Sequence, residues 1–359
     1  MCILQQLRKK DEKKHYLRRK YCCTITEPTP DHNNVKNRYL IYFLLLCLPL
    51  AVKAQGGDNS FTFLKLPYSA RVAGLGGRNI SIVDDDLSMA LHNPALLINV
   101  SDMTLDLSYM TYMRDCNVGG AAFNKRFGER SACAVTARYV DYGKFDGYTQ
   151  DNIFTGTFRA MDFELAGMYC YLLGEKWSGG VSGKFIYSQY ESRNSIALGV
   201  DLGINYYDQE SDFSASLTFK NLGGQVKAFE ERHEIMPIDI QLGITKRLAH
   251  APILVSVTLT DLHRWSTKDF YNADGSNDNF GQMLLKHIVL GADVYIGENF
   301  YASLGYNYRT GRELSAGNNK LGGLSIGAGL HINKVKFSAS YSQLHFSAMS
   351  MLFNLSYSL

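Results

Sequence analysis

Few residues in the chain have types and spacings that suggest chemistry. Gly323-Leu324-Ser325-Ile326-Gly327 matches the G-x-S-x-G pattern of hydrolases, in which a sharp strand-to-helix turn exposes a nucleophilic serine. Here the pattern lies inside an alternating segment with no helical pattern after it. Ser325 is therefore interpreted as a small inward-facing strand residue. An acyl hydrolase would also need a histidine beside it, and no spacing connects His331 or His345 to Ser325. We predict that the protein is not an enzyme.

Metal ligands and cofactor motifs are equally sparse. Asp84, Asp85 and Asp86 form an acidic run, but no EF-hand spacing follows them. Helix capping, or an ion pair with Arg71 or Arg78, is the favoured role for this run. His233-Glu234 lacks the second histidine of a zinc-protease helix, and Cys-x-x-Cys is absent. No metal site and no cofactor is predicted.

The stretch 61–97 differs from everything after it. Gly74-Leu75-Gly76-Gly77 is not a dinucleotide fingerprint, because the third glycine is misplaced and no βαβ unit follows; glycines with positive φ in a tight segment are favoured. Asp85 or Asp86 can cap a helical turn starting at LSMA. Asn93 can cap a second turn with Pro94 at its first position. These signals predict a compact plug over residues 55–102; an ordinary capped helix before a first strand is the alternative.

Residues 40–52 form the only long apolar run, LIYFLLLCLPLAV. Its thirteen residues are too few for a spanning helix, which needs about 20. Basic residues precede it and a small-residue cleavage site follows, so we predict a secretory signal peptide. Residues 1–54, including a basic extension, are expected to be removed.

Removal of this segment changes the charge of the protein. Of 37 basic and 34 acidic residues, 11 and 4 lie in residues 1–54, so the remainder has a net charge of −4 rather than +3. No basic surface then argues for nucleic-acid binding. Cys116, Cys133 and Cys170 remain, an odd and sparse set that predicts no disulfide framework. A single Cys133–Cys170 bridge stays open, and buried or lipid-facing thiols are favoured.

From Met103 onward, apolar and polar residues alternate with a period of two. This pattern predicts an all-β domain over residues 103–359 with fourteen strands. Their expected ranges are 103–113, 117–127, 130–142, 158–173, 176–191, 194–208, 212–222, 237–248, 252–264, 283–297, 299–310, 320–333, 334–344 and 348–359.

Three features favour a membrane barrel over a soluble sandwich. Many segments reach 11 to 16 residues, while soluble strands average about 5–6 and tilted membrane strands need about 9–11. The polar face is mainly Gly, Ser, Asp, Asn and Thr, which suits a lumen. Connections after even-numbered strands are short, and four of those after odd-numbered strands are long and polar. We therefore predict a 14-stranded antiparallel barrel in contact with outer-membrane lipid, with extracellular long loops and periplasmic termini.

The acidic, turn-rich loop 266–280 has two interpretations, a solvated loop or a surface that contacts a partner. The sequence does not choose between them. The candidate partner-binding residues are Trp265, Asp269, Phe270, Tyr271, Asp274 and Asp278.

The plug stretch also carries a family resemblance. It resembles the PorQ family of outer-membrane proteins of the type IX secretion system of Bacteroidetes, which is related to PorV and more distantly to FadL-type fatty-acid channels. The match covers about thirty residues, and the rest of the chain agrees in length and strand layout. The matching residues are Ser69-Ala70-Arg71, Gly74-Leu75-Gly76-Gly77, Asp84-Asp85-Asp86 and Asn93-Pro94-Ala95.

The resemblance implies a FadL-like barrel that anchors a cell-surface attachment complex. Its partners would be a lipopolysaccharide-binding surface protein (PorZ), a sortase-like peptidase (PorU) and a PorV-like barrel, which together process and attach secreted cargo. The alternative is a FadL-like transporter of hydrophobic small molecules. An apolar patch lining the lumen near the plug would favour the transporter, whereas the inward faces that the sequence shows most clearly are Gly, Ser, Asp and Asn.

Overall fold

The computed structural model describes residues 60–113, 115–149, 151–229, 233–266, 270, 278–314, 322–345 and 348–359. These residues belong to one compact unit, Ala54–Leu359. The predicted signal peptide and basic extension, residues 1–54, lie outside the described residues.

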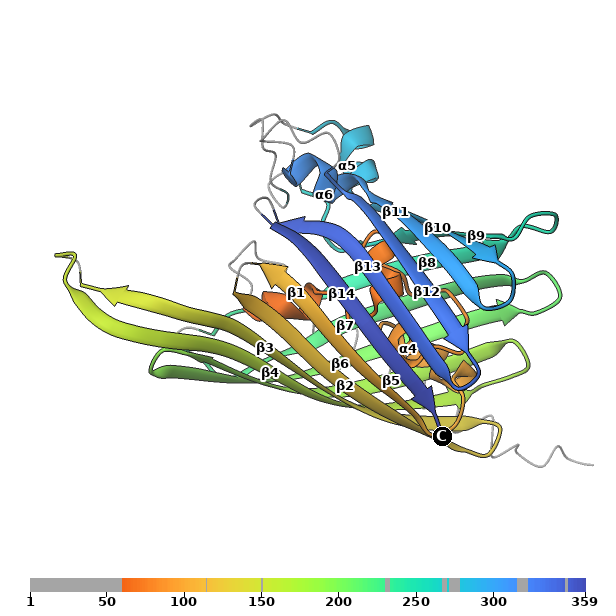
Figure 1. Cartoon of the computed structure of the whole chain (residues 1–359), viewed down its shortest axis with the longest axis horizontal. Helices are drawn as coiled ribbons and strands as arrows, with labels where there is room; N and C mark the ends of the chain where they lie inside the picture. The colour runs from red at the N-terminus through yellow and green to blue at the C-terminus, as the bar shows by residue number, and fades with distance from the viewer. Residues whose placement is uncertain are drawn as a thin grey trace, which may run out of the picture. The chain divides into compact units, whose positions relative to one another are not determined.

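Fourteen antiparallel strands form a closed barrel in which every strand pairs with its sequence neighbours, and β1 pairs with β14. This confirms the predicted fold and the closing role of the last strand (Figure 1). The strands are β1 Thr104–Met113, β2 Cys116–Phe127, β3 Ser131–Tyr148, β4 Phe154–Leu172, β5 Trp177–Tyr190, β6 Arg193–Asp208, β7 Phe213–Lys227, β8 Asp239–Arg247, β9 Ile253–Leu259, β10 Ile288–Ile296, β11 Phe300–Asn307, β12 Leu324–Ile332, β13 Val335–His345 and β14 Ala348–Ser358.

Side chains alternate between the two faces of the barrel wall. In β1, Leu105 and Leu107 are 41% and 46% exposed on the outside, while Asp106 between them is fully buried inside. An apolar outer band around a polar interior is the pattern of a barrel whose outer face meets lipid. The alternation in the sequence therefore predicted correctly which strand residues face outward and which face inward.

The barrel has a short-turn end and a long-loop end. The turns that follow the even-numbered strands are short, as predicted, and the chain returns through longer segments between β7 and β8, β9 and β10, and β11 and β12. The predicted loop Gly143–Thr157 is mostly strand, because β3 and β4 run on as a hairpin arm past their neighbours (Figure 1). Phe145 stacks on Phe158 there with 5.5 Å between ring centroids. Gly143, the first residue of that predicted loop, has φ +83° beside a break in the β3–β4 register.

Two predicted strand ends are helical instead. Helix α5, Phe280–Lys286, occupies the start of the segment expected to be a strand from residue 283. Asn279 and Gln282 form a reciprocal capping box that begins this helix, so β10 starts only at Ile288. Helix α6, Tyr308–Leu314, replaces the end of the strand predicted at 299–310.

The segment before β1 lies inside the barrel, as the plug interpretation predicts. It contains η2 Thr62–Lys65, α3 Ala70–Gly74, α4 Leu87–Ala90 and η3 Pro94–Asn99. Asp86 caps α4 by accepting from the Ser88 N–H, and Asn93 caps η3 by accepting from the Ala95 N–H, with Pro94 at the first position. Within the described part of the chain, no helix is long and apolar enough to cross a membrane.

All three described cysteines are free thiols. Cys133 stands opposite Tyr169, and Cys170 stands opposite Ala132, so the two cysteines are offset by one residue in the β3–β4 ladder. Neighbouring strand positions point to opposite faces. The structure therefore places Cys133 and Cys170 on different sides of the wall, and the open question of a bridge between them is answered in the negative.

Candidate functional site: the lumen and its plug

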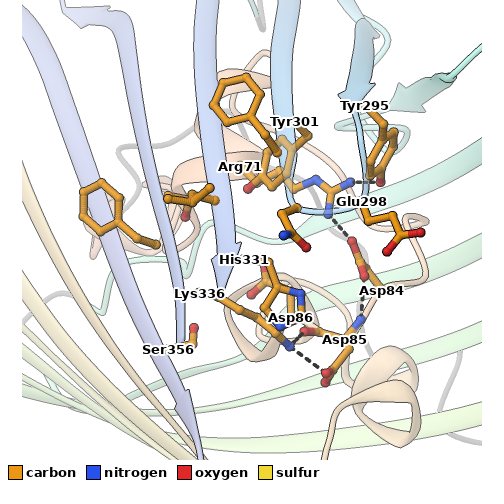
Figure 2. Close-up of a pocket in the computed structure, with 15 residues that line it drawn as sticks. Arg71, Asp84, Asp85, Asp86, Tyr295, Glu298, Tyr301, His331, Lys336 and Ser356 are labelled. Carbon is orange, nitrogen blue, oxygen red and sulfur yellow. Dashed lines mark hydrogen bonds and ion pairs between the residues drawn. The ribbon is translucent and has the colours of Figure 1, made fainter. Parts of the chain in front are cut away.

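Arg71 fixes the plug to the barrel wall. Its Nε donates to Asp293 Oδ2 of β10 at 2.9 Å, and its side chain, only 1% exposed, also pairs with Asp84 and donates to the Tyr295 hydroxyl. Its guanidinium lies 4.4 Å from the ring centroid of Tyr301 (Figure 2). The predicted ion pair between the acidic run and Arg71 is confirmed. A buried charge with this many partners holds one geometry.

The three consecutive acids have three different roles. Burial raises the pKa of Asp84, but the Arg71 guanidinium beside it prevails and leaves that pKa below its usual value. Asp85 pairs with Lys336 of β13 at 2.6 Å (Figure 2), and it also accepts from the Ser101 N–H. Asp86 caps α4, and burial raises its pKa. Across the described ranges, no three His, Cys, Asp or Glu side chains gather as metal ligands would.

The glycine-rich turn of the plug lies directly against strand backbone. Gly76 and Gly77 have φ of +92° and +81°, as predicted, while Gly74 is helical. A Cβ on Gly74 would lie 2.9 Å from the Cα of Gly327, closer than real Cβ atoms approach, and a Cβ on Gly327 would lie 3.2 Å from the Cα of Gly74, a tight contact. Ser325 of β12 accepts from the Gly76 N–H at 2.8 Å and donates to the Gly74 carbonyl at 2.9 Å. The inward-facing serine of the G-x-S-x-G pattern therefore holds the plug.

The second predicted plug motif, Asn93-Pro94, is equally enclosed. Asn93 Nδ2 donates to the Ile80 carbonyl at 2.8 Å. A Cβ on Gly180 of β5 would overlap the main chain of Pro94, and a Cβ on Gly203 of β6 would overlap Asn93. Inward-facing glycines of the strands thus leave the space into which the plug packs.

The lumen is apolar toward the long-loop end. Several inward-facing strand residues are buried there against η2, whose Phe63 and Leu64 are 2% and 7% exposed. We call this group the apolar lumen cluster; its strand members are Met110, Cys116, Val118, Val140, Ile186, Ala197 and Leu352. The sequence pattern indicated mainly Gly, Ser, Asp and Asn on the inward faces and did not predict this apolar patch. The position of Met110 could have indicated this patch from the sequence. Met110 lies at an even position of β1 and therefore on the same inward face as Asp106.

Charged side chains of neighbouring strands face the lumen next to this cluster. Glu164 of β4 accepts from Arg138 Nε at 3.0 Å and from Arg138 Nη2 at 2.5 Å. Lys184 of β5 pairs with Asp201 of β6 at 2.7 Å. These pairs connect neighbouring strands, and Arg138 also donates to the Leu66 carbonyl of the plug.

Three of the cavities that the described residues line lie around the plug and bear on its role. The largest, about 370 Å³, lies near the long-loop end and is lined by Phe63, Leu66, Tyr112, Met113 and charged residues that include Arg309. A second, about 140 Å³, surrounds the Arg71 contacts near the short-turn end (Figure 2). A third, about 40 Å³, lies between the plug and the charged strand residues.

The predicted partner-binding loop is described only in part. Asp269, Tyr271 and Asp274 lie outside the described residues. Trp265 is 47% exposed and stacks on His287 at 4.4 Å. Phe270 is 5% exposed beneath the Arg309 guanidinium, and Asp278 is buried in an ion pair with Lys286 at 2.6 Å. Two of the six candidate residues therefore pack inward.

Comparison with known proteins establishes the fold. No family model matches the chain, and no curated protein matches it either. Neither comparison therefore supports the PorQ resemblance, which stays a prediction. Among solved structures, the monoaromatic hydrocarbon channel CymD aligns over 84% of this chain and 99% of its own, with 14% identity and a TM-score of 0.53.

Two structures of TodX are also similar. A deltaS2S3 mutant of this monoaromatic hydrocarbon channel aligns over 81% of this chain and 99% of its own, with 10% identity and a TM-score of 0.50. The toluene transporter TodX of Pseudomonas putida has 12% identity over 81% and 97%, with a TM-score of 0.49. The similarity to CymD shows that the chain has the 14-stranded fold of FadL-like outer-membrane barrels.

Proposed function

We propose that the protein is an outer-membrane channel that admits a hydrophobic small molecule from the long-loop end. The apolar lumen cluster carries this proposal. A water-filled lumen needs polar inward faces, yet Met110, Val140 and Ile186 turn apolar side chains inward although the outer face already supplies the lipid contact. On this proposal the long-loop end faces the cell exterior.

The cluster and the neighbouring cavity form a route of suitable chemistry. Phe63 belongs to the cluster and also lines the cavity of about 370 Å³ beside it. That volume is in the range of small-molecule pockets, about 300–1,000 Å³. CymD and TodX, whose barrels resemble this one, are described as monoaromatic hydrocarbon channels. A compact apolar solute is therefore the substrate class that fits best.

Uptake of a radiolabelled monoaromatic hydrocarbon by cells that express the barrel tests this function. Ile186 is fully buried in the cluster, so Ile186→Asn places a polar group in the route and should lower uptake several-fold. Ile186→Leu keeps the position apolar and serves as the matched control. Heat-modifiable mobility on SDS gels verifies that both barrels fold. Equal uptake through both folded variants would contradict a transport role.

A membrane anchor for a cell-surface attachment complex is the second candidate. The observation that favours it is the firm seating of the plug: buried Arg71 and the close glycine contacts suit a scaffold better than a moving gate. On this reading the PorZ-like surface protein, with its PorU- and PorV-like partners, would bind at the long-loop end. Replacing residues 265–282 with a short turn should then reduce co-purification of the surface protein while the barrel still inserts. Unchanged co-purification would count against the anchor.

A further inference from the structure

The smallest of the three cavities is strongly cationic. It has a volume of about 40 Å³ and lies between the plug and strands β3–β7. The plug contributes Arg78 to its lining, and the strands contribute Arg138, Lys184 and Lys220; Glu164 is the one carboxylate that lines it.

Two of the four cations are matched by acids. Arg138 donates twice to Glu164, and Lys184 pairs with Asp201 at 2.7 Å and lies 3.8 Å from Glu164. Each of these two carboxylates therefore balances one cation, so the two pairs add no net charge to the cavity.

The other two cations have no such partner. Among the described residues, Arg78 donates to main-chain carbonyls alone, those of Lys65 at 2.5 Å and Gly77 at 3.4 Å. Lys220 of β7 stands opposite Asp239 of β8. Asp239, however, accepts from the Gln241 side chain and from the Asp261 N–H. Within the described residues, no ion pair joins Lys220 or Arg78 to a carboxylate.

The remaining polar lining offers little compensating negative charge. His92 Nε2 already accepts from the Tyr68 N–H at 3.2 Å. Burial, and then the charges of Lys220, Arg78, Arg138 and Lys184, lower the pKa of His92, so its ring is neutral and gives no further acceptor to the cations. The Tyr68 hydroxyl is buried and makes no hydrogen bond within the part of the chain that the structure describes. The described lining thus presents more donors than acceptors, and a half-buried cation such as Arg78 or Lys220 without a counter-ion is unfavourable.

We propose that this cavity binds an oxyanion, a carboxylate or phosphate group, between Arg78 of the plug and Lys220 of β7. One water needs about 10–15 Å³ of such volume, so 40 Å³ accommodates a single small oxyanion. Leu66 and Arg78 line both this cavity and the one of about 370 Å³, so the two cavities are adjacent. The bound anion would join the plug to the wall, and this role is independent of the transport proposal.

Calorimetric titration of the purified full-length barrel in detergent tests the site, with inorganic phosphate in one arm and octyl phosphate in the other. Saturable binding in the phosphate arm identifies a free anion as ligand. Saturable binding in the octyl phosphate arm alone identifies the head group of an amphipathic molecule. Lys220→Met should weaken the binding about tenfold or more, as expected for loss of a charge-assisted hydrogen bond. Lys220→Arg should restore it.

Lys336→Met is the matched control, because Lys336 also faces inward from a strand but lines the cavity at the short-turn end. It should leave the affinity unchanged. No binding in either arm, or equal affinity in the wild type and Lys220→Met, would overturn the proposal. If Lys220→Met does not fold, crystals of the wild type soaked in tungstate decide the question: an anomalous peak must lie between Arg78 and Lys220, and its absence refutes the site.

Discussion

Arg71 of the plug and Asp293 of β10 are 222 positions apart in the chain, yet the Arg71 Nε donates to the Asp293 carboxylate at 2.9 Å inside the barrel. Both side chains are essentially inaccessible to solvent. The pair therefore connects the segment that precedes the barrel to a strand in its second half, and it fixes the plug in both position and rotation.

Arg71→Met should strongly destabilise the protein. Removing one partner of a buried ion pair typically costs about 3–5 kcal/mol, because the other charge remains buried without a partner. Urea unfolding in detergent, followed by tyrosine fluorescence, measures this cost. Lys125→Met is the control, since Lys125 pairs with Asp102 while both are about 45% exposed, and such pairs contribute about 0–1 kcal/mol. Similar losses in the two variants would contradict the role given to Arg71.

Gly305→Ala should displace the plug without disrupting the barrel. A Cβ at Gly305 of β11 would overlap the main chain of Leu75 and Gly76, and main chain cannot move aside as a flexible side chain can. We expect larger ion conductance across planar bilayers than for the wild type. Gly183→Ala is the matched control, because a Cβ at Gly183 meets nothing within 4 Å. Wild-type conductance in folded Gly305→Ala would refute the tight seating.

The plug should loosen in mild acid through His92. Burial and the nearby cations lower the folded-state pKa of His92, so its contribution to stability is complete above the unfolded value of about 6.5 and is lost as the pH falls below it. The loss is up to about 1.4 kcal/mol for each pH unit until the folded pKa is reached. Protonation of Nε2 also breaks the bonds from the Tyr68 and Ser69 N–H groups. The protection factors of these two amides, which correct for the slower intrinsic exchange at lower pH, should fall between pH 7 and pH 5, and His92→Gln should remove most of that dependence. An identical pH dependence in both proteins would exclude His92 as its source.

Phe63→Ala should enlarge the apolar route. Phe63 is 2% exposed and also lies 5.2 Å from the Arg138 guanidinium, so its loss leaves a cavity beside the apolar lumen cluster. Truncation of a buried Phe costs about 3–5 kcal/mol, and here the cost should appear mainly as weaker protection of the η2 amides. Hydrocarbon uptake should rise if the cluster is the route. Phe145→Ala, at an exposed site on the β3–β4 arm, should change neither quantity.

The architecture was predictable because a membrane barrel imposes one strong period on its sequence. Alternation in segments such as β6 and β8 follows from the need to satisfy lipid on one side and the lumen on the other. The predicted strand boundaries were wrong where local sequence signals compete with this alternation. The capping box at Asn279 and Gln282 changed the start of a predicted strand into α5. Gly143, the first residue of a predicted loop, lies within strand β3, so the β3–β4 hairpin is longer than predicted.

The site was predictable only where local motifs define it. Caps at Asp86 and Asn93, and positive φ at Gly76, depend on neighbouring residues and were foreseen. The choice of Arg71 over Arg78 as the partner of Asp84 depends on Asp293, far along the chain. The apolar lumen cluster depends on which inward-facing residues of separate strands lie at the same level along the barrel axis. Such information is held in the strand registers, which no single segment reveals.

The close packing of the plug against glycines of the barrel wall has a consequence for assembly. Gly180, Gly203, Gly305 and Gly327 face the plug only in the observed pairing. Slipping one strand by a single residue would reverse its faces and turn a large side chain, such as Leu304 beside Gly305, toward Leu75 and Gly76. A misregistered barrel therefore cannot accept its own plug. The inner surface of the barrel therefore tests the strand register during assembly, because the N-terminal segment packs inside only when the strands are correctly paired.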